Sequence, residues 1–311
     1  MSTVTADGVI DALGTKTGAE AEAEAEAEAE AEAEAEAETE SARRRAPLSE
    51  VWRIGRVRMA VEVVQLTRNT GLLVYTFAVP VVMLLLFGSI FRGRIEGTDA
   101  TYQQVYATGM IGMCVINGAL QNLAFQVAAE RHTKALKRLR TTPMPAASYF
   151  LGKVASVLAA TLAQISVMLL VGVGLMGLKL PADLGRWFTF TWVLLLGATA
   201  CSLLGIGLSG LIRSEQGAAI VWLPIMVLQF VSGVFLLFST LPRPVQDIGA
   251  AFPVKWLCQG MRSVFLPESF KYSEPARSWE HGRLALVLAA WCVVGLVLCL
   301  RTFSWRGRDD G

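Results

Sequence analysis

Long apolar segments, separated by short polar ones, dominate the chain beyond residue 70. Crossing a bilayer as a helix takes roughly 20 mostly apolar residues. Six segments have this character: 71–91, 104–129, 150–178, 187–212, 217–238 and 284–300. Two of them contain Pro80 and Pro224, which spans tolerate because neighbouring helices can satisfy the freed carbonyl. The pattern predicts an all-α polytopic membrane protein with six transmembrane helices in a domain over residues 70–303.

Basic residues are concentrated in alternate loops of this pattern. They precede the first segment, as at Arg53 and Arg56, lie between the second and third, as at Lys137, and follow the sixth, as at Arg301. Loops rich in Lys and Arg stay on the cytoplasmic side. Both termini, including a tail over residues 304–311, are therefore expected to be cytoplasmic.

The segment 48–69 shows a helical period without being apolar enough to cross. An apolar stripe runs along it at helical spacing, and Arg53, Arg56 and Arg58 lie off the stripe. The stripe consists of Val51, Ile54, Val57, Val61 and Val64. This pattern predicts an amphipathic elbow helix lying on the inner leaflet. A plain juxtamembrane linker is the alternative.

The polar stretch between the last two apolar segments carries two short amphipathic faces on either side of Pro253. Their members are Val245, Ile248 and Phe252, then Trp256, Leu257, Met261 and Val264. The stretch is too polar to span, so it predicts two short helices. They either dip into the outer leaflet as a re-entrant hairpin or lie on its surface.

The first 47 residues form an acidic tail. Residues 19–38 alternate Ala and Glu without interruption, and residues 1–40 carry one Lys against thirteen acidic residues. This alternation offers nothing large to bury, so we expect disorder. An acidic arm that folds back on Arg43, Arg44 and Arg45 is the alternative. The remaining residues are net positive, which suits a protein that meets anionic lipid.

Small and polar side chains inside the apolar segments indicate how the helices pack. Gly197, Cys201 and Gly205 follow a four-residue spacing that allows close helix approach. Amides within the segments need partners in hydrocarbon. Five are candidates for interhelical hydrogen bonds, or for lining a translocation path or protomer interface: Asn117, Gln121, Gln126, Gln164 and Gln229.

Several kinds of chemistry lack their motifs. No Gly-x-x-x-x-Gly-Lys-Ser/Thr run is present, so the chain is not expected to bind a nucleotide through a P-loop. His, Cys and acidic residues form no cluster with metal-ligand spacing. The five cysteines have no CxxC spacing and are interpreted as small hydrophobes, with Cys258 in a loop. We expect no catalytic residue, no cofactor and no nucleic-acid partner.

The loop between the second and third apolar segments is the most polar part of the middle of the chain. Without a Gly or Pro before Pro143, the second span can continue as a short basic helix from Glu130, and Pro143 then ends it. A basic loop that only follows the charge bias is an equal alternative from these residues alone.

The run "AAERHTKALKRLRTTPMPAASYFLGK", residues 128–153, resembles the cytoplasmic loop of ABC-2-type exporter permeases. The matching residues are Glu130, Arg131, Leu136, Leu139, Arg140, Thr142, Pro143, Gly152 and Lys153. The Gly-Thr that commonly precedes the first Leu of the pattern is Lys134-Ala135 here. A second run, "FVSGVFLLFSTLPRPVQDIGAAFPVKWLCQGMR", is similar to the family's fifth span and outer hairpin. The resemblance covers roughly residues 51–301 and is closest to the antibiotic and multidrug branch, of the daunorubicin-resistance type.

The resemblance implies a permease in a bacterial cell membrane that works as a homodimer, or as a pair of similar permeases. It implies two copies of a separate ATPase, which binds the ATP, and a coupling helix over residues 130–140 seated in that ATPase. The residues expected to couple are Glu130, Arg131, Leu136, Leu139, Arg140, Thr142 and Pro143. The cargo would be a hydrophobic small molecule. Two alternatives are a permease for a polysaccharide or lipid-linked glycan, and a membrane immunity protein that sequesters a toxic amphiphile.

Overall fold

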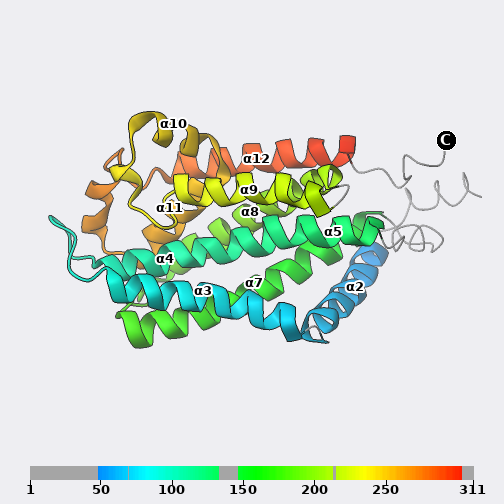
Figure 1. Cartoon of the computed structure of the whole chain (residues 1–311), viewed down its shortest axis with the longest axis horizontal. Helices are drawn as coiled ribbons and strands as arrows, with labels where there is room; N and C mark the ends of the chain where they lie inside the picture. The colour runs from blue at the N-terminus through cyan, green and yellow to red at the C-terminus, as the bar shows by residue number, and fades with distance from the viewer. Residues whose placement is uncertain (1–47, 69, 133–145, 213–214, 303–311) are drawn as a thin grey trace, which may run out of the picture.

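The computed structural model describes residues 48–68, 70–132, 146–212 and 215–302, which form a bundle of long helices (Figure 1). The long helices are α2 (Leu48–Arg68), α3 (Thr70–Ile90), α4 (Tyr102–Val115), α5 (Leu123–His132), α7 (Ala146–Met176), α8 (Leu184–Leu208), α9 (Glu215–Val231) and α12 (His281–Thr302). Shorter helices are η1 (Ile116–Asn122), η2 (Ser209–Leu211), η3 (Phe238–Thr240), α10 (Arg243–Ala251), α11 (Pro253–Phe265) and η4 (Glu268–Ser273). The chain runs back and forth along the long axis of the bundle (Figure 1).

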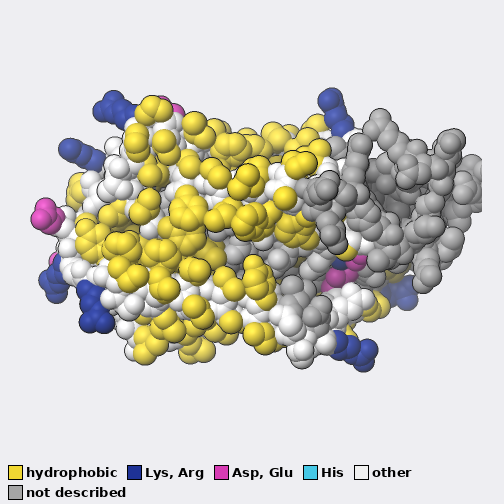
Figure 2. Space-filling model, in the orientation of Figure 1, with side chains coloured by type: hydrophobic (Ala, Val, Ile, Leu, Met, Phe, Trp, Pro, Cys, Tyr) yellow, Lys and Arg dark blue, Asp and Glu magenta, His cyan; other side chains and the backbone are white. Residues whose placement is uncertain are grey.

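The two ends of the bundle differ in what they contain. The elbow end holds α2, the end of α5 and the start of α7, and the hairpin end holds α10, α11 and the segment 266–280 (Figure 1). Hydrophobic side chains cover the middle of the visible face, while most of its Lys and Arg side chains lie toward the ends (Figure 2). This distribution is the one that a bilayer around the middle of the bundle requires.

Five helices in the described part of the chain are long and apolar enough to cross a membrane: Leu73–Ile90, Tyr102–Glu130, Leu151–Met176, Leu184–Leu211 and His281–Cys299. They correspond to five of the predicted segments. The remaining segment, 217–238, was predicted too long, because its helix ends at Val231. Gly233 has a φ of 79°, a conformation that ends a helix readily only at glycine.

The second apolar segment is one continuous helical rod with a wider turn in its middle. The π-helix η1 joins α4 to α5, and it carries Asn117, Gln121 and Asn122. Such π-turns inside α-helices occur often at functional sites. The polar residues of this segment therefore lie where the helix departs from regular geometry.

Glycines let the helices approach closely, as the small-residue spacing predicted. A Cβ at Gly205 would lie 2.6 Å from the carbonyl oxygen of Leu120 in η1, and one at Gly197 would lie 2.5 Å from Leu257 Cδ1 in α11. Gly109 in α4 is tighter still, because its Cβ would lie 2.3 Å from the carbonyl oxygen of Val234. Backbone atoms block the sites at Gly205 and Gly109, so even a methyl group has no room there.

Gly109→Ala is therefore expected to destabilise the protein by about 1–3 kcal/mol, as overpacking of a full core does. The matched control is Gly174→Ala in α7, where a Cβ meets nothing within 4 Å. This control should be neutral, or stabilising by up to about 1 kcal/mol, because alanine favours helix more than glycine does. Thermal unfolding in lipid nanodiscs measures both variants, and equal melting temperatures for the two would contradict the packing described here.

Residues Leu48–Arg68 form one helix, α2, and the face that it buries against the protein lies off the apolar stripe. Val57, Val61 and Val64 are exposed, whereas Gly55 and Glu62 are buried. A Cβ at Gly55 would lie 2.9 Å from Leu151 Cδ2, so α2 packs closely on α7 at this point. The exposed valines leave an apolar face available to lipid, and the inner-leaflet placement of α2 stays a prediction.

The predicted break at Pro253 separates two helices with opposite environments. All residues of α11 are buried, and the helix packs on α4, α8 and α12. In α10 only Gly249 is buried. The bundle therefore covers α11, and the two predicted alternatives, a re-entrant hairpin and a pair on the outer leaflet surface, both stay open. The prediction that Cys258 lies in a loop is wrong, since it is buried within α11.

Candidate functional site

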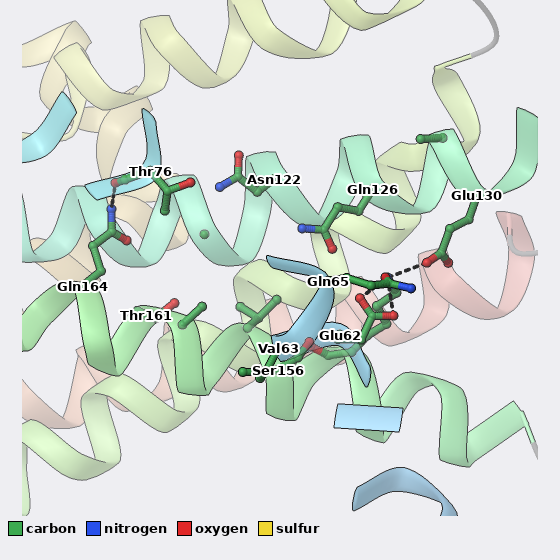
Figure 3. A pocket seen from close by; sticks show the side chains of 15 residues that line it. Glu62, Val63, Gln65, Thr76, Asn122, Gln126, Glu130, Ser156, Thr161 and Gln164 are labelled. Atoms are coloured by element: carbon green, nitrogen blue, oxygen red, sulfur yellow. Dashed lines mark hydrogen bonds and ion pairs between the residues drawn. The ribbon is translucent and has the colours of Figure 1, made fainter. Parts of the chain in front are cut away.

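A buried ion-pair network joins three helices at the elbow end. Lys153 Nζ lies 2.9 Å from both carboxylate oxygens of Glu62 and 2.7 Å from Glu130 Oε1. The Tyr149 hydroxyl donates a hydrogen bond of 2.6 Å to Glu130 Oε2. Glu62 belongs to α2, Glu130 to α5, and Tyr149 and Lys153 to α7. Figure 3 shows Glu62 and Glu130 approaching the same point from different helices.

This network is costly to bury and is well compensated. The Lys153 side chain is 1% exposed and the Glu62 side chain 7%. Removing such charges from water costs several kcal/mol per ion, which close opposite charges and hydrogen bonds must offset. Since each partner comes from a different helix, a movement of α5 relative to α7 would separate charges in a buried site. The network therefore holds the helices in a fixed relation.

Sequence reasoning found part of this network. Glu130 was a predicted coupling residue, and Lys153 belongs to the matched Gly-Lys pair. Glu62 and Tyr149 were missed. Glu62 did carry a signal, because it is a lone acidic residue beside Val61, Val63 and Val64.

The other predicted coupling residues are not placed by the structure. Arg131 lies in the last turn of α5, and its side chain is outside the described part. Leu136, Leu139, Arg140, Thr142 and Pro143 fall outside the described residues. The coupling helix itself stays a prediction.

A cavity of about 270 Å³ extends from the ion-pair network into the bundle. Gln126 and Gln164, two of the predicted path residues, line it together with Asn122, Thr76 and Thr161 (Figure 3). The wall comes from α2, α3, η1, α5 and α7. Some polar residues of the second predicted span thus face polar residues of the third across one cavity.

The remaining predicted path residues lie next to this cavity or bond to a residue beside it. The Gln229 side chain donates a 3.0 Å hydrogen bond to Asn117 Oδ1, which links α9 to η1. Gln121 and Asn117 line a small pocket that adjoins the cavity, since Thr76, Asn122 and Gln164 line both. The hydrogen bond between Asn117 and Gln229 is an interhelical one, as predicted for a polar residue in these segments. A role of the five amides in a translocation path or protomer interface stays a prediction.

Gln164 also supplies a hydrogen-bond donor to a carbonyl that Pro80 leaves without a helical partner in α3. Proline has no N–H, so the carbonyl four residues earlier, that of Thr76, loses its helical partner. The Gln164 side-chain amide donates to this carbonyl at 2.5 Å. The prediction that a neighbouring helix satisfies the freed carbonyl is confirmed at Pro80.

Gln164→Leu is expected to lower stability by about 1–3 kcal/mol, since it leaves a buried carbonyl without a partner. A second measurement isolates this cause. In a Pro80→Ala background the residue at position 80 regains an N–H that can bond Thr76, so Gln164→Leu should then cost less. Thermal unfolding of the four proteins in nanodiscs gives the coupling energy of the cycle. A coupling near zero would mean that the carbonyl is not what makes Gln164 important.

A second buried charge network fixes α11 at the hairpin end. Arg262 Nε lies 2.7 Å from Glu274 Oε1, and Arg262 Nη1 donates to the Gly233 carbonyl at 3.1 Å. Lys255 also belongs to α11. Its Nζ donates a hydrogen bond to Gln259 Oε1 and lies 3.6 Å from the centroid of the Trp256 ring. Burial lowers the pKa of Lys255 to about 8, against the opposing effect of Glu274 and Glu280. Sequence reasoning gave no role to Lys255, Arg262 or Glu274.

No group of three or more His, Cys, Asp or Glu side chains is placed to hold a metal ion within the ranges that the structure describes. All five cysteines are free thiols, and four of them are buried. The two buried charge networks and the polar cavity are therefore the candidate functional features of the described residues.

A comparison with protein families matches residues 57–266 to the family described as ABC-2 type transporter. The matched region begins within α2 and ends just after α11, so it contains Glu62, Glu130 and Lys153 of the elbow-end network. It covers more than half of the 311 residues. No match was found among curated proteins.

Proposed function

The chain belongs to the ABC-2 type transporter family, and from this premise we propose that it is the permease subunit of an ABC exporter. Permeases of this family generally pair with an ATPase subunit. In this proposal a separate ATPase, present in two copies, supplies the energy, and a second permease copy completes the path. The cargo is a hydrophobic small molecule such as an antibiotic. The long apolar helices support a multi-pass membrane protein.

The proposed topology has six crossings with α9 as the shortest. The alternating course of the long helices supports it (Figure 1). The elbow end would face the cytoplasm, together with both termini, and α11 would be a re-entrant helix entering from outside. A cysteine introduced at Lys137 tests the orientation, with the unaltered chain as the control for its native thiols. The introduced cysteine should not be labelled by a membrane-impermeant maleimide in intact cells. Ready labelling would overturn the proposed topology.

The Glu62–Lys153–Glu130 network is the observation that carries the coupling proposal. Glu130 lies near the end of α5 and is the first residue of the predicted coupling helix, and Lys153 links it to the elbow helix. Force applied by the ATPase near residue 130 would thus reach α2 and α7 together. Packed helices and ion pairs with alternative arrangements are the physical means by which such movements are transmitted.

Co-expression with an ABC ATPase encoded beside this chain tests the function. The expected result is co-purification, with ATP hydrolysis in proteoliposomes that rises when suitable amphiphiles are added. Failure of the two proteins to associate would contradict the proposal. A catalytically inactive ATPase provides the second arm. Protection of cells that persists with this ATPase would instead support a sequestering protein.

A further inference from the structure

The cavity next to the ion-pair network contains polar groups that the protein itself leaves without partners. Thr76 is 9% exposed and Thr161 1%, and neither side-chain hydroxyl has a hydrogen-bond partner. A buried polar group left unsatisfied costs about 1–3 kcal/mol. The two hydroxyls line one space, which indicates that something else bonds to them there. The half-buried amides of Asn122 and Gln126 line the same space.

The positions of these groups suit one occupant. Thr161 and Ser156 lie on the α7 wall, and Asn122 and Gln126 lie across from them on η1 and α5 (Figure 3). Gly118 lines the same space, and a Cβ there would lie 2.9 Å from Thr161 Oγ1. Since no side chain projects at position 118, the Thr161 hydroxyl has room beside it.

The chemistry of the lining selects among ligand classes. Hydroxyl and amide side chains each donate and accept hydrogen bonds, so they match a group rich in hydroxyls. The carboxylates of Glu62 and Glu130 at one end of the cavity repel a negatively charged ligand. A cation would compete with Lys153, which already lies within 2.9 Å of both carboxylates. A neutral group fits best, and Val63, Val157 and Ala160 supply apolar surface beside it.

The volume sets the size of the bound group. Pockets for drug-sized ligands measure roughly 300–1,000 Å³, so a cavity of about 270 Å³ holds only part of such a molecule. We propose that this cavity binds the neutral, hydroxyl-rich group of an amphiphile, such as the sugar ring of a glycoside. The apolar remainder of the molecule stays in the surrounding hydrocarbon. The inference rests on the proposed function only in taking this amphiphile as cargo.

Photolabelling of the full chain in lipid nanodiscs, without any ATPase, tests the site. The probe is octyl β-D-glucoside with a diazirine on the first carbons of its alkyl chain, which leaves the sugar hydroxyls intact. Labelled peptides should map to α3, η1 and α7. Unlabelled octyl glucoside should displace the probe at a concentration at least tenfold lower than octyl sulfate, octylammonium or tetraethylene glycol monooctyl ether. Equal or better displacement by any of these three would overturn the proposal.

Variants connect the labelling to the residues. Asn122→Leu combined with Thr161→Val should lower it at least fivefold. Gln121→Leu is the matched control, because Gln121 is the amide next to Asn122 in sequence and is not among the residues that line this cavity. It should keep labelling within twofold. If the double variant does not fold, the nearly isosteric Thr161→Val alone should lower labelling at least threefold, and unchanged labelling would overturn the proposal.

The absence of an ATPase separates this test from that of the proposed function. Loss of ATPase association would leave the labelling unchanged. Binding of the glucoside without any ATP-dependent export would contradict the proposed transport but not the site.

Discussion

Lys153→Met is expected to uncouple the permease and to destabilise it strongly. The variant leaves Glu62 and Glu130 facing each other in a buried site without the cation that both contact. Breaking a buried ion pair by removing one partner costs about 3–5 kcal/mol. Thermal unfolding in nanodiscs measures the stability, and amphiphile-stimulated ATP hydrolysis in proteoliposomes measures the coupling. We expect the stimulation to fall by more than tenfold.

Two controls separate the loss of charge from the loss of coupling. Lys179→Met removes an exposed lysine in the segment after α7 and should change neither measurement. The triple variant Glu62→Gln, Glu130→Gln, Lys153→Met removes every charge of the network while roughly keeping its shape. Because replacing all partners is often nearly neutral, it should recover most of the stability. Coupling should stay low, since the ion pairs between the helices are gone.

Recovery of coupling in this triple variant would contradict the role proposed for the network. A Lys153→Met protein as stable as the unaltered chain would contradict the buried ion pair itself. Either result is decisive, because stability and stimulation are measured on the same reconstituted protein.

Arg262→Met should loosen the hairpin end of the bundle. The variant leaves the Glu274 carboxylate buried without its cation and the Gly233 carbonyl without its donor. Because only one member of a buried ion pair is removed, the stability should fall by about 3–5 kcal/mol. Limited proteolysis should then cut the segment 266–280 faster, because Arg262 holds this segment to α11. The melting temperature should fall together with the rise in cleavage.

Arg243→Met is the matched control, because Arg243 is exposed on α10. It should change neither the melting temperature nor the cleavage of 266–280. Arg262→Met combined with Glu274→Met removes both charges and should recover part of the stability. If Arg262→Met melts like the control, Arg262 does not hold the hairpin end together.

Hydropathy alone located the long helices of this protein. The reason is that a helix must bury its own backbone polar groups and reach across the hydrocarbon, which are requirements on each segment by itself. The break at Pro253 was predictable for a similar reason, since proline acts on the local backbone. The motif around residues 130–153 also pointed to Glu130 and Lys153 before the structure showed them in contact.

The length of α9 and the buried face of α2 were not predictable in this way. A run of apolar residues over 217–238 continues past the point where Gly233 turns the chain. In α2 the valine stripe predicted a face turned to lipid, but nothing in the pattern showed that Gly55 and Glu62 pack on α7. A membrane protein can expose its apolar face to lipid, so apolarity does not identify the side that contacts protein.

The amino-acid sequence by itself determined the helical class, the position of most spans and the family motif, because each depends on residues close together along the chain. Only the tertiary structure decided which buried groups meet. Glu62 and Lys153 are 91 positions apart, and Gln164 reaches a carbonyl 88 positions away. Such pairs are set by how the helices pack against one another, and a single sequence records the charge or amide of each member but not its partner.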